Sequence, residues 1–342
     1  MDVTRAAMYD RDGSISIREI ELPQMNDGEA LVRITACGIC PGEAMDWYVA
    51  RKAPFVLGHE PVGIVEAIGA GVDRLRKGDR VFIHHHAPCM TCKWCERGDY
   101  VQCETWRPAR LVPGGMSERA VVQAQSVAVD MLTLPDAVDD DVATFVEPLA
   151  TVVKSLDRAG DVRGRSVLVI GLGVMGLLHV MLAGRRDAAL IIGVDGVDIR
   201  RAKALSIGAH AVFAPSEAVA RVKEATGGGA DVVVVGPGST AAMDAAAASV
   251  APGGTIVLFT PLPPGERWGI PVNDLFFKDV RITHSYSAGP GDTRKALELL
   301  ENGLPVADLI THRLPLTDVR NAYDLVRDAG EALKVIVYPQ RS

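Results

Sequence analysis

The first 150 residues contain short runs in which hydrophobic and polar positions alternate, with glycine and proline between the runs. Three of them occupy residues 29–36, 63–68 and 79–83. Alternation with a period of two predicts strands that bury one face, and closely spaced turn residues favour a barrel-like arrangement of many short strands. We therefore expect a β-rich domain over residues 1–150.

The pattern changes after Pro148. Four short runs beyond this point are almost entirely apolar and show no alternation, and alanine-rich helical patterns separate them. Apolar strands that alternate with helices indicate a parallel sheet whose two faces are covered by helices, which we assign to residues 151–287. The four runs occupy residues 166–170, 190–194, 231–235 and 255–259.

The end of the chain contains an amphipathic helical pattern near residues 292–302 and an apolar run at 334–338. We expect this segment to return to the first domain, which then comprises residues 1–150 together with 288–342. The fold class that follows is α/β, with a β-rich domain and a domain built on a doubly wound parallel sheet.

Composition narrows the choice of partners. The net charge is −7 with no basic block, so nucleic acid and anionic membranes are not expected to bind. No apolar stretch reaches about 18 residues, and the first residues lack the apolar core of a secretory signal. We therefore expect a cytoplasmic protein whose clustered thiols stay reduced and are available to metal.

A glycine-rich turn follows the first apolar run of the second domain. Gly171, Gly173 and Gly176 form the pattern G-x-G-x-x-G, directly before a helix-compatible segment at residues 174–183. Gly171 allows a tight turn, Gly173 lets the backbone approach a pyrophosphate, and Gly176 lets the helix lie close to the strand. The free N–H groups at the start of the helix favour an anion. This context predicts a Rossmann-type dinucleotide site; a tight turn that binds nothing is the alternative.

An acidic residue, Asp195, follows the next apolar run, 19 residues after Gly176. A carboxylate there can bind the ribose hydroxyls of NAD and repels the 2′-phosphate of NADP, and no arginine is adjacent to it. We therefore predict NAD rather than NADP as the cofactor. The residues expected at the cofactor are Gly171, Gly173, Val174, Met175, Gly176, Asp195 and Arg200.

Four cysteines lie within fifteen residues. Cys89, Cys92, Cys95 and Cys103 have the spacing C-x2-C-x2-C-x7-C. Four thiolates can complete a tetrahedral shell around zinc and leave no open position for a substrate, so the predicted site is structural. An iron–sulfur cluster is the competing interpretation, but the x7 spacing and the absence of a Cys-Pro ending argue against it.

Together these motifs resemble the zinc-containing medium-chain dehydrogenase/reductase (alcohol dehydrogenase) family, nearest its polyol, threonine and glucose dehydrogenase branch. The resemblance covers essentially the whole chain. It implies a GroES-like catalytic domain, a Rossmann NAD-binding domain, an active-site cleft between them, a small-molecule substrate, and a homodimer or homotetramer. Besides the glycine turn and the cysteines, its motifs are residues 38–40, 58–60, 62–63, 77–81, 114–118 and 145–149.

The resemblance also implies a second, catalytic zinc ion, held by Cys40, His59 and either Glu60 or Glu147. Three protein ligands leave one position open, where zinc acts as a Lewis acid on an alcohol or a carbonyl group. The sequence leaves open which glutamate is the ligand. Cys40 could instead be a buried thiol, and Glu60 could support a ligand without binding metal. Cys37, three residues before Cys40, is interpreted as a core residue.

The chain departs from the family pattern after Cys40. The position of the usual serine or threonine is Gly42, and that of the usual histidine is Met45, so the usual route for the alcohol proton is missing. The proton could travel through Glu43, Asp46, Tyr48, a nearby histidine or water. Alternatively, the substrate brings its own acid or base, or the reaction is not alcohol oxidation. The segment between Cys40 and His59 is also short for the family, which predicts a remodelled substrate loop.

Residues 84–86 are three consecutive histidines before the cysteines. They are either the end of a strand with alternate histidines exposed, or they place one imidazole in the active site as ligand support or proton carrier.

Three functions remain. The first is a zinc-dependent oxidoreductase that transfers a hydride between NAD(H) and a secondary alcohol or ketone, which is polyol-, sugar- or cyclitol-like. The second is an NAD(P)H-dependent reductase of an activated C=C or iminium bond, which would need no alcohol proton relay. The third is a binding protein without catalysis, against which the intact set Cys40, His59, Glu60 and Glu147 argues.

Overall fold

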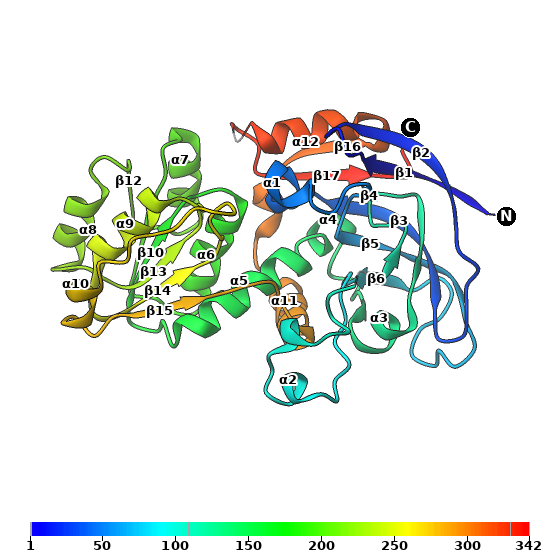
Figure 1. Ribbon diagram of the computed structural model, residues 1–342, viewed down its shortest axis with the longest axis horizontal. Helices are drawn as coiled ribbons and strands as arrows, with labels where there is room; N and C mark the ends of the chain where they lie inside the picture. Colours follow the sequence, from blue (N-terminus) through cyan, green and yellow to red (C-terminus); the bar gives the residue numbers. More distant parts are fainter. Residues whose placement is uncertain (1, 109, 329, 342) are drawn as a thin grey trace. The chain divides into compact units, whose positions relative to one another are not determined.

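A computed structural model describes residues 2–108, 110–328 and 330–341. The chain divides into two compact units (Figure 1). One consists of Met1–Ala150 and Ala288–Ser342, and the other is Thr151–Ser287. Among the described residues, no helix has both the length and the apolar character that crossing a bilayer requires.

The first unit is built on short strands that pair mostly antiparallel, with one parallel pair formed by strands from the C-terminal part of the chain. Its larger sheet has the order β16-β17-β3-β5-β6-β9, with β8 paired to β3 and β7 to β8, and a smaller sheet has the order β2-β1-β4. Its strands are β1 (Val3–Tyr9), β2 (Ile15–Glu21), β3 (Ala30–Gly38), β4 (Phe55–Val56), β5 (Glu60–Ile68), β6 (Arg80–Ile83), β7 (Leu111–Val112), β8 (Arg119–Val122), β9 (Met131–Thr133), β16 (Ile310–Pro315) and β17 (Lys334–Tyr338).

Alternation along these strands fills one core. In β3 every second residue up to Ile34 is buried, and Val32 and Ile34 pack with Val65, Val81 and Val337 from the neighbouring strands. The predicted β-rich domain is therefore confirmed, with strand ends shifted by up to three residues. The helices of this unit are α1 (Asp46–Val49), α2 (Lys93–Glu96), α3 (Ala124–Val129), α4 (Asp140–Ala143), α11 (Pro290–Glu301) and α12 (Val319–Arg327), and α5 (Val146–Ala159) begins in it.

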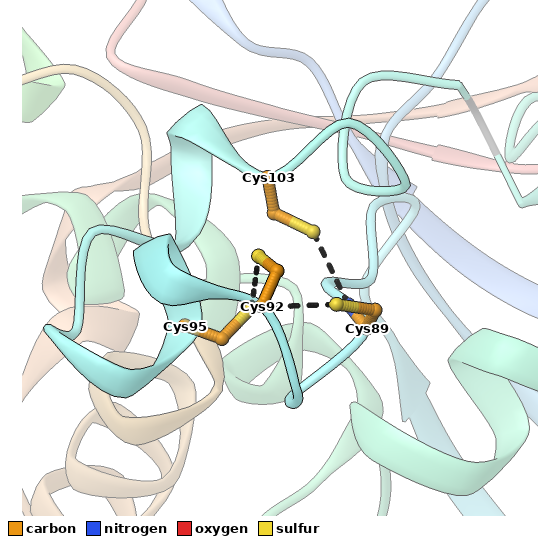
Figure 2. Close-up of side chains that lie close together, drawn as sticks. All are labelled: Cys89, Cys92, Cys95 and Cys103. Atoms are coloured by element: carbon orange, nitrogen blue, oxygen red, sulfur yellow. Dashed lines mark hydrogen bonds between the residues drawn. The ribbon is translucent and has the colours of Figure 1, made fainter.

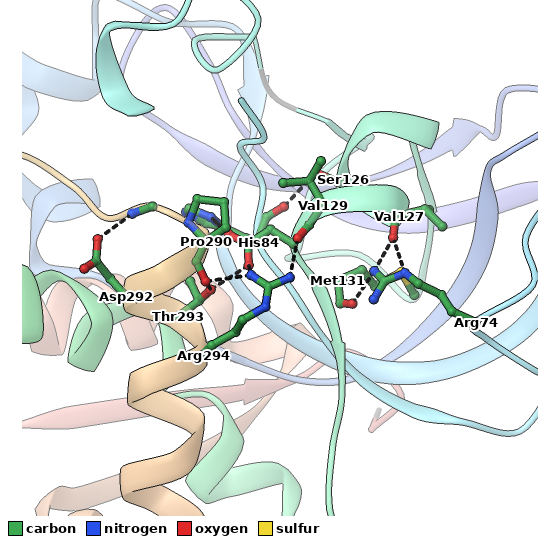
Figure 3. Close-up of polar contacts among 12 residues, drawn as sticks. Arg74, His84, Ser126, Val127, Val129, Met131, Pro290, Asp292, Thr293 and Arg294 are labelled. Atoms are coloured by element: carbon green, nitrogen blue, oxygen red, sulfur yellow. Dashed lines mark hydrogen bonds and ion pairs between the residues drawn. The ribbon is translucent and has the colours of Figure 1, made fainter. Parts of the chain in front are cut away.

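A buried polar network attaches α11 to the sheet (Figure 3). The carboxylate of Asp130, which is fully buried, bonds His84 Nδ1 at 2.7 Å and accepts a hydrogen bond from Thr293 Oγ1 at 2.6 Å. Arg294 adds a bond from its guanidinium to the carbonyl of Val129 at 2.7 Å. The C-terminal part of the chain is thus held to the first 150 residues by the buried Asp130–Thr293 hydrogen bond and by the more exposed bond of Arg294.

Replacing Asp130 by alanine is expected to lower the free energy of unfolding of this unit by about 2–5 kcal/mol, because His84 and Thr293 each lose a buried partner. The shift of the urea midpoint measures this loss. As a control, alanine at the exposed Asp308 is expected to change stability by less than about 0.5 kcal/mol. Equal stability of the two variants would contradict the importance of the network.

The second unit is a six-stranded parallel sheet with the order β12-β11-β10-β13-β14-β15. Numbered within the unit, this is the order 3-2-1-4-5-6 of a Rossmann fold, so the predicted fold class is confirmed. Its strands are β10 (Ser166–Ile170), β11 (Leu190–Val194), β12 (Ala211–Phe213), β13 (Ala230–Val235), β14 (Val250–Leu258) and β15 (Arg281–His284), and its helices are α6 (Val174–Arg185), α7 (Asp198–Ser206), α8 (Ala218–Thr226), α9 (Thr240–Ser249) and α10 (Val272–Phe276).

The glycine turn joins β10 to α6, as the sequence predicts. Gly171 has φ of +87°, a backbone conformation that residues with a Cβ rarely adopt. A Cβ atom at Gly176 would collide with the carbonyl oxygen of Gly171, so only glycine lets α6 approach the turn this closely. The strand order reverses between β10 and β13, and ligands of such sheets bind at the carboxyl ends of the strands at this point.

Candidate active site and metal centres

The candidate catalytic ligands meet where two paired strands end. Gly38 at the end of β3 pairs with Glu60 at the start of β5, so the residues just beyond these positions lie side by side. As a result, the ligand atoms of Cys40, His59 and Glu60 all lie within 4.8 Å of one another. These residues offer one sulfur, one nitrogen and one oxygen donor, and three protein ligands suit a zinc ion that keeps one coordination position open.

Glu43 fixes the orientation of His59. It lies in the single turn Pro41–Ala44, is buried, and bonds His59 Nδ1 at 2.8 Å. Its carboxylate also accepts hydrogen bonds from the Gly58 N–H at 3.1 Å and from the Tyr323 hydroxyl at 2.6 Å. With Nδ1 engaged, His59 has only Nε2 left for a metal. A carboxylate with so many partners is better suited to positioning His59 than to carrying a proton away.

Glu60 is fully buried and forms an ion pair with Lys334 of β17. Burial raises the pKa of Glu60, and Lys334 opposes this effect. The second carboxylate oxygen, Oε1, is buried and has no hydrogen-bond partner among the described residues. Such an atom is costly unless something binds it, and it lies beside a cysteine and a histidine. This orphaned oxygen indicates that the site fits a cation.

The charges around His59 give a second test of that fit. Burial opposes ionisation of His59, but Glu43 and Cys40 outweigh burial and raise its pKa well above the usual value. Burial raises the pKa of Cys40, which His59 counteracts. The site thus favours a positive charge next to these groups, and a zinc ion would supply one.

The other candidate carboxylate, Glu147, lies in the first turn of α5 and is only 5% exposed. It is near enough for its charge to raise the pKa values of Cys40 and Glu60. Among the described residues it is not part of the group whose ligand atoms lie within 4.8 Å. The geometry therefore favours Glu60 as the third ligand and leaves Glu147 as a nearby acidic group.

The structure also shows what surrounds the positions that break the family pattern. A Cβ atom at Gly42 would lie 3.4 Å from Cys40 Sγ and 3.9 Å from the Met45 methyl group. A hydroxyl group at position 42 would thus lie beside a candidate ligand. In this chain, however, neither Gly42 nor Met45 has a side chain that can transfer a proton. Of the other candidate carriers, Asp46 is 72% exposed and Tyr48 accepts a hydrogen bond from Lys52.

The expectation that alternate histidines of residues 84–86 are exposed is wrong. Strand β6 ends at Ile83 and the chain bends at His85, so the alternation of a strand no longer applies. His84 is fully buried on Asp130, and the rings of His85 and His86 lie together, with centroids 3.8 Å apart. The His85 ring is 4.9 Å from that of His59. Burial lowers the pKa of His85 well below its usual value and that of His86 to about 3, so both are neutral.

The four clustered cysteines form a separate site (Figure 2). The sulfur atoms of Cys89, Cys92, Cys95 and Cys103 lie within 4.8 Å of one another, on a loop that carries the short helix α2. Hydrogen bonds from Thr91 lower the pKa of Cys89 to about 6, which favours a thiolate. Four thiolates that surround a common point suit a structural zinc ion and leave no ligand position for a substrate.

The predicted cofactor residues surround the glycine turn of the second unit. A pocket of about 410 Å³ is lined by Gly171, Asp195, Pro237 and Ser239 among others. Asp195 accepts hydrogen bonds from the N–H groups of Leu172 at 2.7 Å and Val197 at 2.8 Å, which fix its carboxylate beside the pocket. Helix α6 begins at Val174, and Met175 is its second residue. The guanidinium group of Arg200 lies beside the glycine turn, since its Nη1 atom would be 3.8 Å from a Cβ atom at Gly173.

Sequence reasoning missed several residues of both sites. Pro237 and Ser239 line the cofactor pocket, and their sequence signal was the run G-P-G-S directly after an apolar strand. Lys334 and Tyr323 hold Glu60 and Glu43. A lysine inside the apolar strand Lys334–Tyr338 could have indicated a buried acidic partner, whereas Tyr323 carried no such signal.

Comparisons with known proteins agree with this geometry. Residues 26–135 match the family described as "alcohol dehydrogenase GroES-like domain", and residues 174–302 match "zinc-binding dehydrogenase". The chain is 32% identical to L-threonine 3-dehydrogenase of Pyrococcus horikoshii over 93% of each chain, and 28% identical to sorbitol dehydrogenase of Bombyx mori over 98% of each. A structure described as a zinc-binding dehydrogenase from Sinorhizobium meliloti 1021, bound to NADP, has a TM-score of 0.87 and 27% identity, over 99% of this chain and 100% of that one.

Fold and site together define a dehydrogenase of the two-domain, alcohol dehydrogenase type. The chain belongs to the zinc-containing medium-chain dehydrogenase/reductase family, in the branch that includes polyol and threonine dehydrogenases.

Proposed function

We propose that this protein is a zinc-dependent oxidoreductase that transfers a hydride between NAD(H) and a secondary alcohol or ketone, with a polyol-, sugar- or cyclitol-like substrate. The observation that carries the proposal is the group Cys40, His59 and Glu60, in which a buried carboxylate oxygen has no partner among the described residues. Zinc bound there would stabilise the negative charge on the alcohol oxygen as the hydride leaves.

The protein's own groups would prepare the site for this step. Glu43 holds His59 so that Nε2 is free to bind metal, and Tyr323 and Gly58 hold Glu43 in turn. Lys334 balances the charge of Glu60 and keeps one of its oxygens occupied, which leaves the other for the metal. These contacts fix the ligand geometry in advance, which reduces the reorganisation needed in the reaction.

The test is turnover by the purified, zinc-loaded protein. We expect NADH to form from NAD and a panel of sorbitol, xylitol, myo-inositol and simple secondary alcohols, and the reverse reaction with the corresponding ketones. Metal analysis is expected to give two zinc ions per chain. Absence of turnover in both directions by protein that contains both ions would refute the proposal.

A second candidate is a reductase of an activated C=C or iminium bond, which Gly42 and Met45 favour because no proton-transferring side chain stands at either position. It predicts NADH consumption with enones or iminium compounds and no NADH formation from any alcohol.

We propose NAD as the preferred cofactor because the Asp195 carboxylate is fixed beside the pocket at the end of β11. Asp195→Asn keeps the size of the side chain and removes its charge, so the ratio of kcat/KM for NADP to that for NAD is expected to rise about tenfold or more. Asp198→Asn, a 93% exposed position nearby, is the control and should leave the ratio unchanged. An unchanged ratio in Asp195→Asn would show that this carboxylate does not select the cofactor.

We further propose that two copies of the chain associate through the edge of the parallel sheet. Strand β15 is the edge strand, and the segment before it exposes Val272, Phe276 and Phe277, the last two by 74% and 80%. Exposed apolar groups of this size indicate a contact surface. Phe277→Ser is expected to shift the sedimentation coefficient towards that of a single chain. Ile199→Ser, at an exposed position on α7, is the control that should not shift it. Equal sedimentation of both variants would contradict this surface.

A cytoplasmic location fits the same proposal, because the thiolates of the cysteine site must remain reduced to bind metal.

A further inference from the structure

A row of four aromatic rings joins the two candidate metal sites of the first unit. The centroid of the Trp106 ring is 4.1 Å from that of His86, and the His86 ring is 3.8 Å from that of His85. The His85 ring in turn lies 4.9 Å from the ring of His59, a candidate catalytic ligand. Planar rings at these distances are in contact. We call these four side chains the ring row.

The Trp106 end of the row belongs to the cysteine loop, residues 89–106. Trp106 is only 2% exposed and packs with Cys95 and Cys103 in a small cluster apart from the main core of the unit. Its N–H also donates to the carbonyl of Cys103, a candidate metal ligand, at 3.0 Å. A change in the position of Cys103 therefore moves Trp106, and close packing passes such a movement to the next ring.

The His59 end belongs to the candidate catalytic site. Glu43 bonds Nδ1 of His59 at 2.8 Å, which holds one edge of this ring. A bond at one atom still lets the ring tilt, and the contact with the His85 ring limits that tilt. The tilt sets the direction of Nε2, the nitrogen available to a metal ion. This direction matters because neighbours that orient a ligand contribute about 10–100-fold to metal affinity.

The middle of the row is supported by residues next to the paired strands β6 and β9. The buried His84 ring lies 5.3 Å from that of His85 and 6.2 Å from that of His86, and His84 Nδ1 is bonded to Asp130 at 2.7 Å. The Arg110 N–H donates to the carbonyl of His85 at 2.7 Å. These strands thus support the row from one side, and the cysteine loop supports it at its end.

We propose that the ring row makes the metal affinity of the candidate catalytic site depend on a metal ion in the cysteine site, with Trp106 and His86 as positioning residues for His59. The inference rests on the two metal sites of the proposed function and adds a coupling between them. Because such a coupling is reciprocal, an ion at either site strengthens the binding of the other. His86 acts through the shape of its ring, since its buried Nδ1 atom has no hydrogen-bond partner among the described residues.

Substitutions that keep or remove a ring test this role of shape. His86→Phe and Trp106→Phe keep a flat ring at their positions, whereas His86→Ala and Trp106→Leu remove it. Trp94→Leu is the matched control, because Trp94 belongs to the same loop and is partly buried, but its ring lies beside Lys93 and Arg97 and outside the row.

Competition with a chelator measures the dissociation constants of both zinc ions, and the Cys40→Ser variant shows which of them belongs to the candidate catalytic site. Trp106→Leu and His86→Ala are expected to raise that constant about 10–100-fold. Both should also change the visible absorption of cobalt(II) that replaces zinc there, because these bands depend on ligand geometry. His86→Phe and Trp106→Phe should stay close to the wild type, and Trp94→Leu should equal it.

A double variant separates transmission through the row from two independent losses. Cys95→Ser, which releases the ion of the cysteine loop, is expected to weaken zinc binding at the candidate catalytic site to a similar extent. In this background Trp106→Leu should cause little further weakening, because the coupling is already absent. Two independent effects would instead multiply. The melting temperature of each variant shows that it is folded at the temperature of the measurement.

Unchanged dissociation constants and cobalt spectra in Trp106→Leu and His86→Ala would overturn the inference, and so would losses that multiply in the double variant. If Trp106→Leu does not fold, the comparison of His86→Ala with His86→Phe decides, and equal affinities in these two variants overturn the coupling as well. The proposed function survives each of these results. Wild-type protein that binds no ion at Cys40, His59 and Glu60 would instead refute both the proposed function and the coupling.

Discussion

Cys40→Ser is expected to bind one zinc ion per chain instead of two and to lose at least about 10³-fold in kcat/KM with secondary alcohols. The thiolate is one of three candidate ligands whose donor atoms lie within 4.8 Å of one another, and a metal bound there would provide several kcal/mol of stabilisation to the developing charge. Metal analysis and steady-state kinetics with NAD measure the two effects.

The chain offers a matched control three residues away. Cys37 is a fully buried thiol of β3 that packs in the core, as the sequence predicts, and is not part of the ligand group. Cys37→Ser should keep both zinc ions and most of the activity. If Cys40→Ser retained two ions and its rate, the position of the candidate catalytic site would be wrong.

Removal of one ligand from the cysteine site is expected to affect stability first. Cys95→Ser should release the second zinc ion, lower the melting temperature by about 10 °C, and open residues 89–103 to limited proteolysis. The small buried cluster of this loop consists of Cys95, Val101, Cys103 and Trp106, so a metal bound by the four cysteines would supply most of its folding energy.

Lys93→Ser, an exposed position of α2 between two of the ligands, is the control and should leave the melting temperature within about 2 °C. A Cys95→Ser variant that melts with the wild type would mean that the loop folds without metal.

Those parts of the fold that depend on local hydrophobic pattern could be predicted from the sequence. Strands β10, β11 and β17 have the predicted ends, because each is a short, predominantly apolar run. Strand β14 begins at Val250, five residues earlier than expected. Its first turn-like residues, Pro252 to Gly254, belong to the strand because the pairing with β13 shifts in register there.

The candidate site shows where such prediction ends. The candidate site residues carry recognisable motifs, but their supporting partners come from distant sequence: Lys334 is 274 residues from Glu60, and Tyr323 is 280 from Glu43. The pairing of β3 with β5 decides whether the carboxylate of Glu60 or that of Glu147 lies close to Cys40, and no local sequence pattern predicts this pairing. The error at residues 84–86 has a similar origin, because the partners of this segment are distant in sequence: the Arg110 N–H donates to the His85 carbonyl, and the His86 ring lies against Trp106.

The pairing of Glu60 with Lys334 also constrains the order in which the two units can fold while the chain is being synthesised. The ribosome releases the strand that carries Glu60 long before it makes β17, and the whole parallel-sheet unit is translated in between. A nascent chain that has emerged only as far as Ser287 would have to bury Glu60 without its counter-ion, which costs several kcal/mol. The unit formed by the two ends of the chain therefore closes after the unit inserted between them can fold.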